Sequence, residues 1–140
     1  MGTRSGPHMG TDKDGESVMQ ITAKLGLKKP ESNEYINVAD FNYNADQIDK
    51  LGAVKTATLP SAGWSNTAPY TQTVEVPGVQ AIDTPVVSLY LSDGVTAAEV
   101  KLQSKAYGYA DRAVTGAGSI TVYCYNKKPA VDFQIQLKGV

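Results

Sequence analysis

The feature that most constrains the fold of this chain is a strict alternation of apolar and polar side chains near its C-terminal end. From residue 131 to residue 138, every second side chain is apolar: Val131, Phe133, Ile135 and Leu137. Successive side chains of a β-strand point to opposite faces, so a period of two predicts a strand with one buried face. Residues 119–125 repeat the pattern with Ile120, Val122 and Cys124. Two such segments predict a β-rich fold around a shared core.

Further strand signals precede these two segments. Residues 53–59 are rich in β-branched side chains, and residues 70–76 alternate between polar and apolar. Residues 85–92 are more continuously apolar, which predicts a central strand because strands buried on both faces lose the alternation. A Thr-Gly-Ala-Gly sequence, suitable for a hairpin loop, separates residues 109–114 from residues 119–125. We therefore expect about six strands in the main domain.

A helix is expected between the strands, over residues 96–106. Thr96 and Glu99 have the spacing of a capping box, and Ala97, Val100, Ser104 and Tyr107 fall on one narrow face. Such a helix would cover one side of a sheet. The predicted fold is mainly β, a β-sandwich-like domain of about six strands with one packed helix, preceded by a short helical, coiled-coil-like N-terminal stalk.

The stalk prediction depends on a second helix signal, which begins at Asn37 and ends near Gly52. Asn37 can cap the helix with Asp40 three residues later. Its apolar side chains follow the a/d spacing of a coiled coil and are named here the apolar seam: Val38, Phe41, Ala45 and Ile48. A helix of about three to four turns is unstable alone in water, so the seam must be buried. Two burials are open: docking onto the chain's own β domain, or self-association of about three copies.

The domain organisation follows from these signals. Residues 1–18 are Gly-rich, polar and without periodicity, and we interpret them as an expression tag and linker that contains the chain's one histidine, His8. Residues 19–52 form an N-terminal arm and the short oligomerisation helix, with a strand expected over residues 20–23 and an extended arm over residues 25–30. Residues 53–140 form the β domain.

Charge and composition exclude several classes of function. The 140 residues carry a formal net charge of −1 and no basic stripe, which argues against nucleic acid as the main partner. The basic pairs at residues 28–29 and 127–128 are interpreted as solvated loop charges. No apolar run is long enough for a membrane span, so we expect a soluble protein without membrane insertion. Cys124, the single cysteine, is expected to be a buried and inert thiol.

The chain offers no recognisable catalytic motif. A Ser nucleophile elbow, a phosphate-binding Gly-rich loop and a paired-histidine metal motif are all missing from the sequence. Its aspartates fall on helix surfaces, at turns or on polar strand faces, where capping and solubility explain them. We therefore expect no enzyme, no cofactor, no catalytic residue and no metal ligand.

The aromatic residues are the candidate binding residues. Tyr107, Tyr109, Tyr123 and Tyr125 lie in neighbouring segments and could gather several phenol rings on one hairpin, a surface suited to sugar or protein recognition. The alternative is that these rings fill a core or a subunit interface. Trp64 and Tyr70 lie where the stalk meets the β domain, and we expect them to anchor that junction.

Taken together, residues 19–140 resemble a family of small tail-fibre or tail-associated proteins of phages and prophages of Gram-positive bacteria. The resemblance in the N-terminal part is carried by LGLKKP (residues 25–30), YINV (35–38) and FNYNADQID (41–49). In the β domain it is carried by Trp64, PYTQTV (69–74), VPGV (76–79), SITV (119–122) and KPAVD (128–132).

The resemblance implies a component of the virion tail, made in the bacterial cytoplasm. It implies a homotrimer whose helix lies near the attachment end, where it contacts a tail or baseplate protein, and whose β domain lies distally. The leading hypothesis is that the β domain binds a host surface glycan or protein without catalysis. The alternative is a structural tail or baseplate adaptor with no host contact, or a fibre of a phage-tail-like bacteriocin or contractile injection particle.

Overall fold

A computed structural model describes residues 20–31, 34–35 and 37–140. The predicted tag and His8 lie outside these residues. The chain forms two compact units, one ending at Leu51 and the other comprising Gly52–Val140. Each unit is described by itself below.

The N-terminal unit contains a small hairpin. Strands β1 (Gln20–Ile21) and β2 (Lys28–Lys29) pair antiparallel. The turn is closed by hydrogen bonds from the Thr22 amide to the Leu27 carbonyl and from the Gly26 amide to the Thr22 carbonyl, at 2.9 and 3.1 Å. Gly26 adopts a φ of 65°, a left-handed conformation that a glycine adopts without strain. The expected strand and extended arm are thus the two sides of one turn.

Helix α1 (Val38–Lys50) follows the hairpin, and its predicted N-terminal cap is confirmed. The Asn37 side-chain oxygen accepts a hydrogen bond from the Asp40 amide at 2.8 Å. The helix holds the hairpin through its polar side: the Asn44 side chain bonds both the amide and the carbonyl of Lys28, at 2.7 and 2.8 Å. The Lys28 ammonium group is 2.9 Å from the Asp40 carboxylate. The prediction that Lys28 is a solvated loop charge is therefore wrong, because the residue lies in a strand and is paired.

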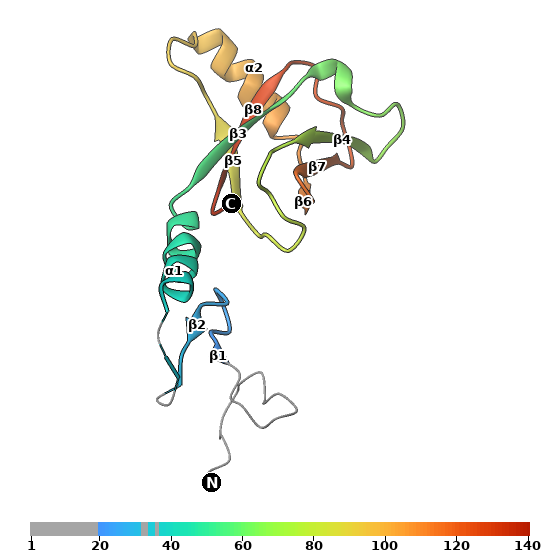
Figure 1. Ribbon diagram of the computed structural model, residues 1–140. Coiled ribbons are helices and arrows are strands. Elements are labelled where there is room, and N and C mark those ends of the chain that lie inside the picture. The colour runs from blue at the N-terminus through green and yellow to red at the C-terminus, as the bar shows by residue number, and fades with distance from the viewer. Residues whose placement is uncertain (1–19, 32–33, 36) are drawn as a thin grey trace. The chain divides into compact units, whose positions relative to one another are not determined.

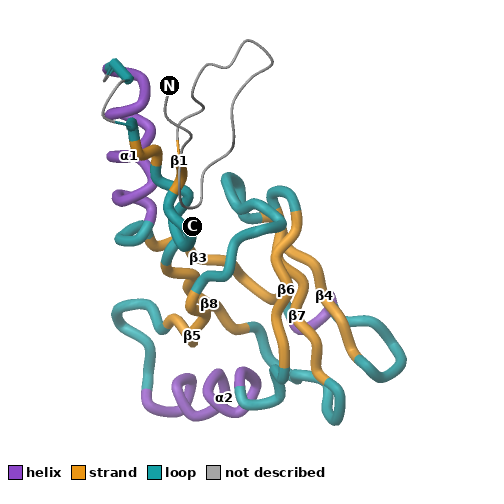
Figure 2. Tube along the Cα trace, turned by 90° about the horizontal axis from the view of Figure 1, so that it is seen from below, coloured by secondary structure: helices purple, strands orange, loops and turns teal. Residues whose placement is uncertain are grey.

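The Gly52–Val140 unit is built from two three-stranded antiparallel sheets (Figure 2). One sheet has the order β3 (Val54–Leu59), β8 (Phe133–Lys138), β5 (Val86–Tyr90), and the other has the order β4 (Tyr70–Glu75), β7 (Ser119–Cys124), β6 (Arg112–Gly116). The fold is mainly β, and a β-sandwich-like arrangement fits it, as the alternation predicted. The core is shared between the sheets, and its largest fully buried side chains include Leu59, Ile120, Phe133, Ile135 and Leu137.

Strand β8 is the centre of its sheet. It pairs with β3 on one side and with β5 on the other, and Phe133, Ile135 and Leu137 are buried as their alternation predicts. The prediction that residues 85–92 form a central strand is wrong. Strand β5 lies at the edge of the sheet, where Val86 is 70% exposed. An apolar run indicates that the faces of a strand are buried, whereas a central position requires that both of its edges are paired. Pairing is not visible in a local sequence.

The second sheet contains the predicted hairpin. Gly116 pairs with Ser119 across a two-residue loop, in which Gly118 has a φ of 72°. Strand β4 alternates as predicted, and its inward side chains include Gln72, which is 6% exposed. Gln72 is tolerated in the interior because its amide nitrogen donates a hydrogen bond to the Pro60 carbonyl at 3.1 Å. Pro60 precedes the short 3-10 helix η1 (Ser61–Gly63).

Helix α2 (Ala97–Tyr107) lies beside β8 (Figure 1), and its predicted capping box with Thr96 and Glu99 is confirmed. Its buried face agrees with the prediction only in part, since Val100 and Tyr107 are half-buried. Ala97 and Ser104 are exposed, whereas Ala106 is 2% exposed and Gln103 is half-buried. Alanine recurs around this helix, so the sequence gives little preference for one face, and packing against the sheet selects it.

Candidate functional site

The most exposed aromatic group of the β domain lies on strand β7 and the residue after it. The rings of Tyr123 and Tyr125 are stacked with their centroids 6.3 Å apart and an interplanar angle of 16°. The Arg112 guanidinium carbon lies 5.1 Å from the centroid of the Tyr123 ring, a cation–π arrangement. We name Arg112, Tyr123 and Tyr125 the tyrosine–arginine cluster.

Strand geometry explains why these three side chains meet. Ile120, Val122 and Cys124 point inward on β7, so Tyr123 points outward. The register of the β6–β7 hairpin places Arg112 directly opposite Tyr123. Tyr125 is held by a hydrogen bond of 2.7 Å from its amide to the Asp111 carboxylate.

The electrostatics of the cluster favour a permanent positive charge beside the rings. The pKa of Arg112 is raised above its ordinary value, chiefly by hydrogen bonding with Tyr125. The Tyr125 ring is 45% exposed, so an aromatic face and a guanidinium group are both available to a partner. Neighbouring hydroxyls on the same sheet, those of Thr73 and Thr121, are 2.7 Å apart. The surface can stack a sugar ring or another flat group and offer it polar contacts.

The other two predicted tyrosines do not join this cluster. Tyr107 packs edge-to-face on Phe133, with ring centroids 6.2 Å apart at 74°, and its hydroxyl donates to the Val87 carbonyl at 3.4 Å. It therefore supports the core, as the alternative interpretation of these rings allowed. Tyr109 is half-buried, and the Lys127 ammonium group lies 6.0 Å from the centroid of its ring.

Trp64 lies in the core of the Gly52–Val140 unit. It is 4% exposed and stacks on Phe133 with ring centroids 6.3 Å apart at 17°. Trp64 is thus shielded from any ligand, while its role as an anchor at the junction with the stalk stays a prediction. Tyr70, at the start of β4, is half-buried.

The apolar seam of α1 is exposed. Val38 is 74% exposed, Phe41 71% and Ile48 54%, and Ala45 is exposed as well. The hairpin of the same unit instead occupies side chains at other positions of the helix, Asp40, Tyr43 and Asn44. Among the described residues of this unit, the hairpin therefore bonds polar side chains of the helix and leaves the apolar seam exposed.

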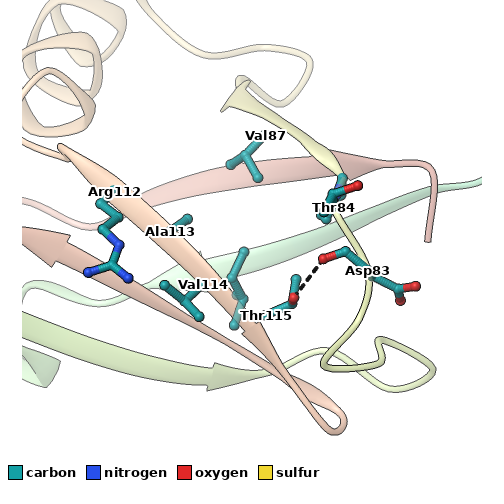
Figure 3. Close-up of a pocket in the computed structure, with 9 residues that line it drawn as sticks. Asp83, Thr84, Val87, Arg112, Ala113, Val114 and Thr115 are labelled. Carbon is teal, nitrogen blue, oxygen red and sulfur yellow. Dashed lines mark hydrogen bonds between the residues drawn. The ribbon is translucent and has the colours of Figure 1, made fainter.

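A first hollow, of about 390 Å³, lies between the edge strands β5 and β6. Figure 3 shows Arg112, Ala113, Val114 and Thr115 along one side of it. The Thr115 hydroxyl shares its proton between the carbonyls of Ala81 and Asp83, at 3.2 and 2.8 Å. It thereby ties the loop before β5 to β6. Its lining mixes polar and apolar side chains, and Ile82 and Val86, adjacent in sequence to lining residues, are 85% and 70% exposed.

A second hollow, of about 370 Å³, lies between the C-terminal half of α2 and the loop that joins β7 to β8. Its apolar lining includes Leu102, Ala106 and Val131, and two half-buried rings, Tyr70 and Tyr109, border it. Three lysines also line it, Lys105, Lys127 and Lys128, and we name it the lysine hollow. Sequence reasoning missed these lysines as site residues, although two of them follow Tyr125 within three positions.

Metal-ligating side chains and the single thiol were the remaining groups of interest in the described residues. Within residues 20–31, 34–35 and 37–140, no group of three or more His, Cys, Asp or Glu side chains could hold a metal ion. Cys124 is buried, as predicted, and burial raises the pKa of its thiol to about 11. A thiol with that pKa stays protonated at neutral pH and is a poor nucleophile. No helix in the described part of the chain is long and apolar enough to cross a membrane.

Comparisons with protein-family models, with curated proteins and with solved structures find no match to this chain.

Proposed function

We propose that this protein is a short, homotrimeric component of a phage tail, which recognises a host surface glycan or protein through its β domain and performs no catalysis. The observation that carries this proposal is the exposed apolar seam of α1, on a helix that contacts the hairpin through other side chains. The resemblance of residues 19–140 to tail-fibre proteins supplies the biological setting.

Self-association gives the apolar seam a partner of matching chemistry. Val38, Phe41 and Ile48 repeat at the a/d spacing, so identical helices can bury the same residues against one another. Burying a large apolar side chain contributes roughly 1.5–3 kcal/mol, so several such side chains per copy can hold an oligomer together. A trimer would then present three copies of each binding surface.

Recognition is assigned to the β domain because its exposed surface offers aromatic and cationic groups held on regular strands. The tyrosine–arginine cluster is one such surface, with the Tyr125 ring 45% exposed. Three linked copies of a weak site can raise the apparent affinity by ~10²–10⁴ if they engage together. Such a gain in apparent affinity suits a protein that attaches a phage particle to a cell.

The second candidate function is a structural adaptor that contacts other tail or baseplate proteins and no host molecule. Two exposed apolar side chains next to the first hollow favour it, since Ile82 and Val86 are 85% and 70% exposed and β5 is an edge strand of its sheet. Exposed apolar patches and open strand edges are typical contact surfaces for other proteins.

The test combines a mass measurement with a binding measurement. Light scattering of the full chain at micromolar concentration should give three times the 14.9 kDa chain mass, and a monomer would contradict the assembly proposal. Purified cell walls of Gram-positive bacteria should retain the protein, and retention should fall for Arg112→Gln with Tyr125→Leu but not for Lys101→Gln. Loss of cell-wall binding together with retained affinity for a tail protein would favour the adaptor. Shortened polysaccharide chains after incubation would contradict the absence of catalysis.

A further inference from the structure

The lysine hollow concentrates positive charge in a chain whose formal net charge is −1. Lys105 comes from the last turn of α2, where a cation also stabilises the helix end. Lys127 and Lys128 come from the loop after β7. In the part of the chain that the structure describes, no carboxylate lines the hollow.

The carboxylates nearest to this site in the sequence accept hydrogen bonds from other residues. Asp111 accepts a hydrogen bond of 2.7 Å from the Tyr125 amide, and Asp132 accepts one of 2.7 Å from the Ser61 amide. Among the described residues, none of the three lysines forms an ion pair. Their charge is therefore available to an anion from solution.

Aromatic rings stand beside this charge. Tyr109 borders the hollow, and the Lys127 ammonium group lies 6.0 Å from its ring centroid. Tyr70 borders the hollow from β4 and is half-buried, so its position is set by the fold. Apolar ring faces beside hydrogen-bond donors suit a sugar, whose C–H face packs on a ring while its polar groups bond to side chains. Asn126 adds a further donor and acceptor at the rim.

We propose that the lysine hollow binds a sugar that carries a phosphate or a carboxylate. The hollow's volume of about 370 Å³ falls at the lower end of the range of small-ligand sites, which favours one or two sugar units over a large ligand. The lysines hold the anionic group, and Tyr70 and Tyr109 hold the sugar ring. This assignment rests on the proposed recognition function of the β domain and names the chemical class of its ligand.

Nucleic acid and acidic peptides are less suited to this site. A nucleic acid needs a stripe of basic residues along its backbone, whereas the positive charge here is confined to one hollow. An acidic peptide would need backbone partners or further charges, and the hollow instead provides rings and an apolar lining. Both are outcomes that the experiment below can detect.

The experiment is a titration of the ¹⁵N-labelled full chain followed by NMR, with ligands up to on the order of 10 mM. Glucose 6-phosphate and glucuronate should shift the amide signals of Tyr109 and residues 126–128, whereas glucose should shift them far less. A response to one sugar acid alone identifies which anionic group the site takes. Binding of inorganic phosphate as tightly as glucose 6-phosphate would overturn the sugar assignment. Absence of shifts, or tighter binding of an oligonucleotide or of oligoglutamate, would overturn the proposal.

Variants then locate the site. Lys127→Gln with Lys128→Gln should weaken the binding of glucose 6-phosphate about tenfold, since two of the three cations proposed to hold its anionic group are removed. Lys101→Gln with Lys138→Gln removes the same charge from exposed positions outside the hollow and should leave binding unchanged. Tyr109→Leu should weaken both sugar acids. Equal loss in the two double variants would show that only net charge matters and would overturn the site.

The outcome separates this inference from the proposed function. If the sugar acids do not bind but purified cell walls still retain the protein, the ligand assigned to the lysine hollow is wrong and recognition through the tyrosine–arginine cluster stands. If the sugar acids bind at the hollow but cell walls do not retain the protein, the ligand assignment is correct and the host-binding function is wrong.

Discussion

At the scale of single residues, Gly63 and Gln72 show how a polar group is accommodated in the interior. The buried Gln72 amide donates to the Pro60 carbonyl, and Gly63 stands next to its side chain at the end of η1. A Cβ added at Gly63 would lie 2.6 Å from the Gln72 Cδ and would overlap its Oε1. The absence of a side chain at Gly63 therefore makes room for the Gln72 amide and its hydrogen bond.

We predict that Gly63→Ala destabilises the β domain by about 1–3 kcal/mol, the typical cost of overpacking. The added methyl group must displace the Gln72 amide, which then loses its bond to Pro60. Urea denaturation measures the change. A matched control is Gly63→Ala in a Gln72→Ala background, where the clash is absent and the further loss should be small. An unchanged unfolding midpoint for the single variant would contradict this account.

Cys124 carries the second prediction at this scale. Its pKa is raised from 9.0 to about 11 by burial, so the folded state keeps a proton that the unfolded state releases. The free energy of unfolding should therefore fall as pH rises from about 9 to about 11, and Cys124→Ala should remove that part of the decline. The folded wild type should also resist iodoacetamide at pH 8 until denaturant is added. Rapid modification of the folded protein would argue against this prediction.

At the scale of elements, α2 illustrates a helix whose start is encoded locally. The Thr96 hydroxyl oxygen accepts a hydrogen bond from the Glu99 amide, and the Glu99 carboxylate accepts one from the Thr96 amide at 2.7 Å. The pKa of Glu99 is lowered chiefly by the bond from the Thr96 amide to its carboxylate, and next by a bond from the Thr96 hydroxyl to the same carboxylate at 2.8 Å. Because the charged form of Glu99 is favoured in the folded state, its contribution is present above pH 4.5 and is lost as pH falls through the lowered value.

We predict that Thr96→Ala lowers the stability of the β domain by about 1 kcal/mol at neutral pH, the typical value of an N-cap. The deficit relative to the wild type should shrink in acid, once Glu99 is protonated. Urea denaturation at pH 7 and at pH 3 measures both effects. Thr67→Ala, at an exposed threonine outside the helix, is the matched control. An equal effect of both substitutions would contradict the capping role.

At the scale of the whole molecule, assembly is expected to depend on one helix and folding of the β domain on other residues. The apolar seam belongs to the unit that ends at Leu51, whereas the core around Phe133 belongs to Gly52–Val140. Substitutions in the seam should therefore change the mass in solution and leave the fold of the β domain intact.

We predict that Phe41→Ser with Ile48→Ser converts the proposed trimer to a monomer, since each copy would lose two large side chains from the proposed interface. Sedimentation velocity measures the mass, and near-ultraviolet circular dichroism of Trp64 should stay unchanged. Asp46→Ser, on the same helix and outside the seam, should remain trimeric. A double variant that stays trimeric would show that the seam is not the interface.

Particular elements show how much of this structure could be read from the sequence. The alternation of β8, the N-terminal caps of α1 and α2 and the hairpin at Gly118 were predicted correctly, because each depends on neighbours a few residues apart. The edge position of β5 and the pairing of Lys28 were predicted wrongly, and the buried face of α2 was predicted only in part, since each depends on segments distant in sequence.

The candidate sites divide in the same way. The amino-acid sequence alone places Tyr123 on the face opposite Ile120 and Val122, because side chains alternate between the two faces of a strand. The positions of Arg112 over Tyr123, of Tyr107 on Phe133, and of Lys105 in one hollow with Lys127 and Lys128 became clear only from the folded chain. Alternation and capping act between near neighbours, whereas strand register and helix docking are set by packing of the whole core.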